Sequence, residues 1–169
     1  NVVVSRSIEK DKKVIEKSVE EFMEYPYSIW IAILAEGTRF TKAKHEASIE
    51  FAKLKGIEPL KHHLIPRASG FNASVPIMKK YDNVVAYNVE IRFDKNDKNA
   101  PTLANLLLRR KVTAHIYFER IPMNKIEPSF EYLYGIYKQK DALAESFNTF
   151  GNFYEGRGLK VQEGIKMKP

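Results

Sequence analysis

Apolar positions recur along this chain at two spacings, which predict helices alternating with strands. Helical spacing marks residues 8–23, residues 44–55 and a long segment opened by Pro128. A glycine in the left-handed conformation is expected to end the second helix at Gly56. The third helix has one apolar face, formed by Phe130, Leu133, Tyr134, Tyr137, Leu143 and Phe147.

Four other segments are predicted to be strands. Residues 29–35 form a continuous apolar run rich in β-branched side chains, which is typical of a strand buried on both faces. A short strand over 60–65 is expected to end at Pro66. Alternating apolar side chains in 85–93 and 112–118 indicate two strands that each bury their apolar face.

These elements together predict an α/β fold with a mixed, mainly parallel sheet flanked by helices. Residues 1–150 are expected to form the folded domain, and the glycine- and charge-rich residues 151–169 a flexible tail. A further helix within 74–81 is expected to start at Pro76, because proline lacks the N–H that a helix interior needs.

Composition narrows the possible functions. The 169 residues are 44% hydrophobic, which excludes a disordered chain, and the absence of cysteine excludes a disulfide scaffold, a thiolate nucleophile and a Cys-ligated metal. The longest apolar run is far shorter than the roughly 20 residues that span a bilayer. A net charge of +7 indicates an anionic partner: nucleic acid, a phosphorylated metabolite or a membrane surface.

The most informative candidate site is the turn Glu36-Gly37-Thr38-Arg39, directly after the predicted buried strand. Open α/β sheets bind ligands at such turns. Gly37 lets a ligand approach the backbone, Thr38 offers a hydroxyl, and Arg39 offers a planar fork of donors suited to phosphate. A plain strand-to-loop turn with a solvent-facing ion pair is the alternative interpretation.

The histidines do not indicate a catalytic or metal site. His45 and Glu50 are five positions apart and do not share a helix face. His62 and His63 are adjacent on a predicted strand and point to opposite faces, and His115 stands alone. We therefore predict no catalytic residue and no metal site within this chain.

Several blocks of the sequence resemble the 1-acylglycerol-3-phosphate (lysophosphatidic acid) acyltransferases. Residues 36–39 match that family's Glu-Gly-Thr-Arg block. Val4-Ser5-Arg6 followed by Glu9-Lys10-Asp11 resembles a block upstream of it, and residues 60–71 resemble an apolar strand that ends in proline. Segments 87–89, 116–122 and 140–141 resemble the eukaryotic, endoplasmic-reticulum branch.

The resemblance implies roles for individual residues. Gly37, Thr38 and Arg39 would bind the phosphate of lysophosphatidic acid, Glu36 would shape the site, and Arg6 would add a second cation. Two neighbouring arginines would make an anion pocket.

Two residues after the predicted strand 60–65 are further candidates. Pro66 would bound the wall of the pocket. Arg67 is either another contact to the phosphate or headgroup, or a solvated surface cation.

The activity implied is transfer of a fatty acyl group from acyl-CoA, a co-substrate, to the 2-hydroxyl of lysophosphatidic acid, without a cofactor. The family's catalytic Asn-His-x-x-x-x-Asp motif, whose His removes the proton from the acceptor hydroxyl, does not occur in these 169 residues. We therefore expect a fragment of a longer enzyme that is inactive alone. The parent would be held in the endoplasmic reticulum membrane by transmembrane segments outside this chain.

Two alternatives stay open at this point. The acceptor would be another lysophospholipid if a different headgroup accompanies the same phosphate. A basic nucleic-acid-binding module is the other possibility, suggested by Arg109-Arg110-Lys111 and the abundant aromatic residues. Against that module, the aromatic side chains follow the periodicities of a core, so the membrane surface and the lipid substrates are the favoured partners.

Overall fold

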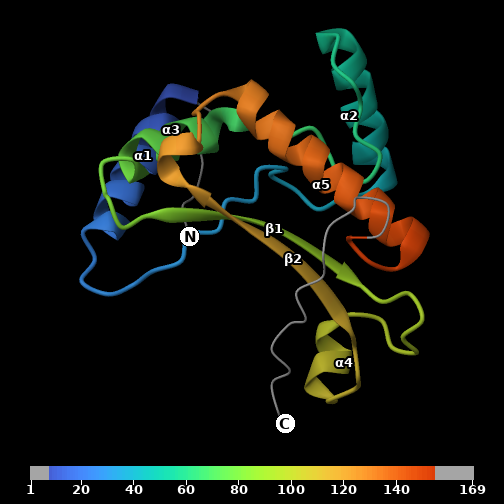
Figure 1. Cartoon of the computed structure of the whole chain (residues 1–169). Coiled ribbons are helices and arrows are strands. Elements are labelled where there is room, and N and C mark those ends of the chain that lie inside the picture. The colour runs from blue at the N-terminus through green and yellow to red at the C-terminus, as the bar shows by residue number, and fades with distance from the viewer. Residues whose placement is uncertain (1–7, 155–169) are drawn as a thin grey trace. The chain divides into compact units, whose positions relative to one another are not determined.

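The computed structural model describes residues 8–154. Its elements in chain order are α1 (Ile8–Met23), α2 (Lys42–Lys55), α3 (Ala68–Met78), β1 (Val85–Phe93), α4 (Leu103–Leu107), β2 (Ala114–Pro122), a 3-10 turn (Met123–Lys125) and α5 (Phe130–Phe150) (Figure 1). The chain divides into two compact units. Of the described residues, unit 1 contains 8–88 together with Glu119–Asp141, and unit 2 contains Val89–Phe118 and 142–154.

The predicted mixed α/β composition is confirmed, but the mainly parallel sheet is wrong. The only sheet within residues 8–154 is the antiparallel pair of β1 and β2. Residues 29–35 and 60–65, expected as strands, have no strand structure. A strand exists only where a neighbouring backbone completes its hydrogen bonds, so an apolar run is not sufficient to form one.

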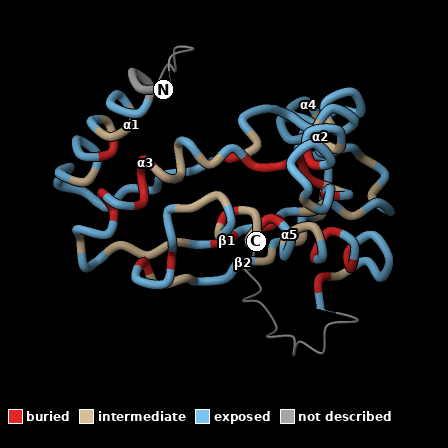
Figure 2. Tube along the Cα trace, turned by 90° about the horizontal axis from the view of Figure 1, so that it is seen from above, coloured by how far each residue is buried: buried red, intermediate tan, exposed pale blue. Residues whose placement is uncertain are grey.

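The two missing strands differ in their burial. In the first segment the side chains up to Leu34 are exposed, Trp30 by 88%, and Ala35 alone is buried. In the second, Leu60, Leu64 and Ile65 are buried, so this segment contributes to the core without pairing as a strand. Figure 2 shows the resulting pattern, in which buried residues occupy short stretches between exposed ones.

Three of the predicted helices are confirmed. α1 has the predicted bounds, and α2 begins at Lys42, where the Thr41 side chain caps it by accepting the N–H of Lys44 at 3.4 Å. Gly56 ends α2 in the left-handed conformation, at φ 66°. The predicted apolar face of α5 is buried or half-buried.

The expected start of a helix at Pro76 is wrong, because α3 runs from Ala68 to Met78 with this proline inside it. Pro76 lies in the last turn of α3, where its missing N–H costs a single intrahelical bond near a frayed end. The residues before it form the rest of α3, and Ser74 donates its hydroxyl to Gly70 O at 2.8 Å.

Unit 1 has two apolar clusters, both built partly from loop residues. The first consists of Val19, Val75, Ile77, Met78, Met123 and Ile126. The second consists of Ala35, Ala52, Leu60, Ile65, Leu133 and Tyr137. The second cluster holds the end of the segment 29–35 beside the segment that follows α2, and this arrangement positions the candidate site.

Unit 2 contains a small apolar core and residues 89–93 of β1. On this part of β1 the apolar side chains, which were predicted to be buried, are exposed. Leu143, Phe147 and Phe153 form the core. On β1 the apolar side chains of Val89, Ile91 and Phe93 are exposed, while Glu90 is buried. The strand itself was predicted correctly, but its period of two cannot say which face is covered.

No helix among the described residues is both long enough and apolar enough to cross a membrane.

Candidate phosphate-binding turn

The candidate site is built on the turn that follows residues 29–35. Gly37 has φ +67°, a conformation that glycine adopts without steric cost, and its N–H donates to Leu34 O at 3.0 Å. This bond closes the turn. Thr38 and Arg39 follow as exposed residues, and Glu36 is half-buried. The turn therefore has two exposed polar residues, Thr38 and Arg39.

Arg67 is brought to this turn from a distant part of the sequence. Its backbone N–H donates to Ala35 O at 2.8 Å, which ties the two segments together. Its side chain lies over Gly37, with Arg67 Cδ 3.5 Å from the position that a Cβ of Gly37 would take. Pro66 is buried beside it, and Ile65 N–H donates to Ser48 Oγ at 2.8 Å. The structure thus places the exposed Arg67 side chain beside the turn.

Lys44 is a further member of the site that the sequence interpretation missed. Its Nζ donates to the Thr38 hydroxyl, across the N-terminus of α2. The available signal was the capping residue Thr41, which fixes the start of α2 so that Lys44 lies in its first turn. That first turn contains no acidic residue.

Three cationic residues lie at or next to the turn, which also contains the carboxylate of Glu36. Arg39 and Arg67 form no ion pair within residues 8–154, and Lys44 adds a third cation through Thr38. The N-terminus of α2 contributes the positive end of its dipole. Such an arrangement suits a small anion with several oxygen atoms, because guanidinium forks and helix N-termini both bind phosphate. The predicted second cation, Arg6, lies outside the described residues.

His45 has a structural contact rather than a catalytic one. Its Nε2 donates to Leu60 O at 2.7 Å, and its ring lies 4.9 Å from that of Phe40. His45 and Glu50 form no bond within the described residues, in keeping with their positions on different faces of α2.

A buried His–Asp pair, which was not predicted, joins the segment before Arg67 to α5. His63 Nδ1 lies 3.2 Å from Asp141 Oδ1, and the backbone N–H groups of Lys61 and His62 donate to the same carboxylate at 2.8 and 2.7 Å. Burial alone would raise the pKa of Asp141, but the hydrogen bonds from His63 and the two N–H groups outweigh it and lower the pKa to about 2.

This pair has the chemistry of a base and its orienting carboxylate, but its surroundings indicate a structural role. His63 is 6% exposed and its ring contacts Tyr137 edge-on at 5.9 Å. The carboxylate holds the backbone of the segment that leads to Arg67. The pair therefore positions the segment that leads to Arg67 beside the candidate turn.

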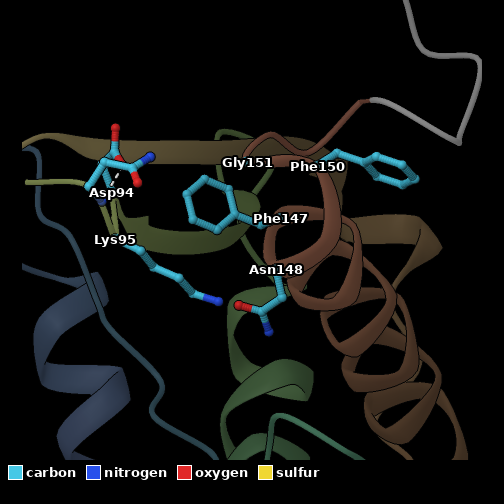
Figure 3. A pocket seen from close by; sticks show the side chains of 7 residues that line it. Asp94, Lys95, Phe147, Asn148, Phe150 and Gly151 are labelled. Atoms are coloured by element: carbon cyan, nitrogen blue, oxygen red, sulfur yellow. Dashed lines mark hydrogen bonds between the residues drawn. The ribbon is translucent and has the colours of Figure 1, made fainter.

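Unit 2 contains a separate depression that includes none of the predicted site residues (Figure 3). Its lining consists of Asp94, Lys95, Asn96, Phe147, Asn148, Phe150 and Gly151. Figure 3 shows the Lys95 side chain extending toward that of Asn148. Among the residues that the structure describes, no cluster of His, Asp and Glu could hold a metal ion.

Comparison with known proteins gives a consistent set of relatives. A family model described as the acyltransferase C-terminus matches residues 105–167. The chain is 36% identical over 158 residues to 1-acyl-sn-glycerol-3-phosphate acyltransferase delta of Homo sapiens, covering 91% of this chain and 41% of that protein. It is 34% identical over 156 residues to the gamma enzyme of Homo sapiens, covering 90% and 41%.

The delta enzyme of Mus musculus is 35% identical over 158 residues, again with 91% of this chain and 41% of that protein covered. The chain thus spans well under half the length of the curated relatives it matches. No solved structure matches it.

Proposed function

Since this chain is a relative of the 1-acyl-sn-glycerol-3-phosphate acyltransferases and corresponds to their C-terminal region, we propose that it carries the acceptor-phosphate half of such an enzyme's active site. The proposed reaction transfers a fatty acyl group from acyl-CoA to the 2-hydroxyl of lysophosphatidic acid and yields phosphatidic acid. The membrane of the endoplasmic reticulum is the proposed location of the full-length protein.

The observation that carries this proposal is the gathering of cations at one turn. Arg67 lies over Gly37, Lys44 is bonded to Thr38, and Arg39 follows in the chain. These groups come from three separate segments. A phosphate monoester with two negative charges would be held by guanidinium forks and by an ammonium group at the start of α2.

The contribution of this site to the reaction would be positioning. The hydroxyl oxygen of the acceptor attacks the thioester carbonyl, a C–O bond forms, the C–S bond breaks, and coenzyme A leaves as the thiolate. The hydroxyl proton passes to a base, which the family's Asn-His-x-x-x-x-Asp motif supplies and this sequence does not contain. Holding the phosphate fixes the distance from the hydroxyl to that base.

Binding and turnover would therefore separate in the chain of 169 residues. It would bind the acceptor but would not transfer the acyl group. The phosphate is common to lysophosphatidic acid and to other lysophospholipids, so the turn accounts for recognition of the phosphate and not for headgroup choice.

A titration of the purified chain with glycerol 3-phosphate, followed by NMR, tests the binding site. We expect shift changes at residues 36–39 and at Arg67. Arg39→Gln and Arg67→Gln are each expected to weaken the binding of glycerol 3-phosphate roughly tenfold or more. Each variant removes a charge-assisted hydrogen bond worth about 1.5–3 kcal/mol. The control is Lys53→Gln, an exposed cation in the last turn of α2. Equal effects of all three variants would contradict a specific site.

Activity is tested in the full-length protein proposed to contain this chain. Arg39→Ala is expected to abolish acyl transfer to lysophosphatidic acid, while Lys53→Gln leaves it unchanged. Near-normal turnover of the Arg39→Ala enzyme would overturn the proposal. Robust acyl-CoA turnover by the 169 residues alone would show that a base exists within them.

A further inference from the structure

The connection between β1 and β2 exposes a group of leucines. Helix α4 lies in this connection (Figure 1). The helix and the residue that follows it contain Leu103, Leu106, Leu107 and Leu108, which are 71%, 70%, 74% and 61% exposed and which we call the leucine face. No residue of α4 is buried, and none of the four belongs to an apolar cluster. Four large apolar side chains within six positions therefore face solvent.

The orientation of α4 is fixed by its polar residue, Asn105. The Asn105 Nδ2 donates to Ala100 O at 2.8 Å, and its Oδ1 accepts from Arg110 Nη1 at 3.0 Å. Its backbone N–H donates to the Thr102 side chain, which caps the helix, at 3.2 Å. These bonds turn the polar side of α4 toward its own loop. The four leucine side chains remain exposed to solvent.

A run of three cations follows the leucine face directly. Arg109 adopts a left-handed φ of 53°, and its N–H donates to Leu106 O at 3.0 Å while Arg110 N–H donates to Asn105 O at 2.9 Å. This pair of bonds is a Schellman motif, which ends the helix and reverses the chain. Arg109, Arg110 and Lys111, which we call the basic run, are exposed and form no ion pair within residues 8–154.

The charge around this connection is not balanced by acids. The connection, residues 94–113, contains five Lys and Arg residues and two acidic residues, Asp94 and Asp97. The Asp97 carboxylate accepts hydrogen bonds from the backbone N–H and the hydroxyl of Thr113, and Asp94 Oδ1 accepts from Asn96 N–H at 2.8 Å. Both acids are thus engaged within the connection, and its net charge is positive.

We propose that the leucine face and the basic run together dock onto the surface of an anionic lipid bilayer. The leucines would enter the boundary between headgroups and acyl chains, and the cations would remain at the lipid phosphates. Exposed leucines are followed directly by exposed cations, and the apolar acyl region of a membrane surface lies directly beneath its charged phosphates. The order of the side chains therefore corresponds to the order of these two regions. This proposal does not depend on the phosphate-binding turn, which belongs to unit 1.

Flotation of the purified chain with lipid vesicles tests the proposal. One set of vesicles is pure phosphatidylcholine, and the other contains three parts phosphatidylcholine to one part phosphatidylserine. Binding is expected to the second set. The double change Leu106→Asp with Leu107→Asp should lower binding to it by about tenfold or more. The triple change of Arg109, Arg110 and Lys111 to Gln should lower vesicle binding by a similar factor at low salt. The difference from the wild type should shrink at high salt, because salt screens the attraction between the cations and the lipid phosphates.

Matched controls come from α2, which also carries an exposed leucine between two lysines. Leu54 is 86% exposed, and Lys53 and Lys55 flank it. Leu54→Asp, and the paired change of the two lysines to Gln, should leave vesicle binding within about twofold of the wild type. Circular dichroism verifies that each variant is folded. The Arg39→Ala variant should bind these vesicles normally, which separates this test from that of the proposed function.

Two results would overturn the proposal. One is vesicle binding that the leucine and arginine variants do not change, or that the α2 controls reduce equally. The other is no binding to either set of vesicles together with a concentration-dependent dimer that Leu106→Asp with Leu107→Asp abolishes, which would assign the leucine face to a second copy of the chain.

Discussion

The side chain of Arg67 lies over the backbone of Gly37, with its Cδ 3.5 Å from the point where a Cβ would project. The two residues belong to segments that are joined by the bond from Arg67 N–H to Ala35 O, 2.8 Å long. The glycine turn and the cation above it are therefore directly connected through the backbone. A change at either residue is expected to affect the binding of an anion at the other.

Gly37→Ala should separate the effect on stability from the effect on binding. A Cβ at φ +67° costs about 1–2 kcal/mol, and relief of that strain would shift the turn beneath Arg67. We expect a lower urea midpoint and a severalfold weaker affinity for glycerol 3-phosphate. Gly56→Ala is the matched control, since Gly56 has φ +66° and no atom within 4 Å of the added Cβ. It should lose similar stability and keep its affinity; equal affinity losses would contradict the role of Gly37.

Asp141 should make the stability of the fold depend on acidic pH. Its pKa is about 2 in the fold against 3.8 ordinarily, so its contribution is complete above 3.8 and is lost as the pH falls toward 2. The difference corresponds to about 2 kcal/mol. In Asp141→Asn, urea unfolding should show a comparable loss at neutral pH and a weaker decline below pH 4. Glu131→Gln, an exposed carboxylate on the same helix, is the control, and an unchanged acid profile in Asp141→Asn would refute the assignment.

Removal of one member of the ion pair on β1 should lower the free energy of unfolding. Glu90 Oε1 lies 2.8 Å from Arg92 Nη2, and the Glu90 side chain is 6% exposed. Glu90→Ala leaves the guanidinium without this partner in a largely buried position, so we expect a loss of about 3 kcal/mol in the free energy of unfolding. Replacing both residues by leucine should cost less than Glu90→Ala alone. A double variant that is less stable than the single one would argue against this account.

Arg109→Gly should stabilise the connection that contains α4. Arg109 has φ 53° at the position where a Schellman motif usually has glycine. Removing its Cβ relieves about 1 kcal/mol of strain. Thermal unfolding should move to higher temperature in Arg109→Gly and stay unchanged in Arg109→Ala, which keeps the Cβ. If both variants were stabilised equally, the cause would be the loss of the Arg109 charge and not the relief of backbone strain.

Local sequence signals predicted the helices well. The amphipathic spacing of α1, the Gly56 stop of α2 and the apolar face of α5 each depend on neighbours within a few positions. Helix α4 was missed because it is only five residues long, which is too short for helical spacing of its three leucines to be recognised. Its only polar member, Asn105, orients it through contacts to the loop.

The candidate site was predicted in part. Residues 36–39 form a glycine turn as expected, and Arg67, a candidate with two possible roles, lies over that turn. Lys44 was not predicted, because its bond to Thr38 depends on where α2 begins. The pairing of His63 with Asp141 was also not predicted, since residues so far apart in sequence meet only through packing.

The sequence by itself determined helices α1, α2 and α5, the two strands that pair, the glycine turn and the relationship to the acyltransferases. These depend on short-range periodicity, on glycine and proline chemistry, and on blocks of residues in a fixed order. Only the tertiary structure decided that residues 29–35 form no strand, that β1 exposes its apolar side chains, and that Arg67 and Lys44 join the turn. Strand pairing, burial and the convergence of cations each require a partner distant in sequence, and no local pattern specifies that partner.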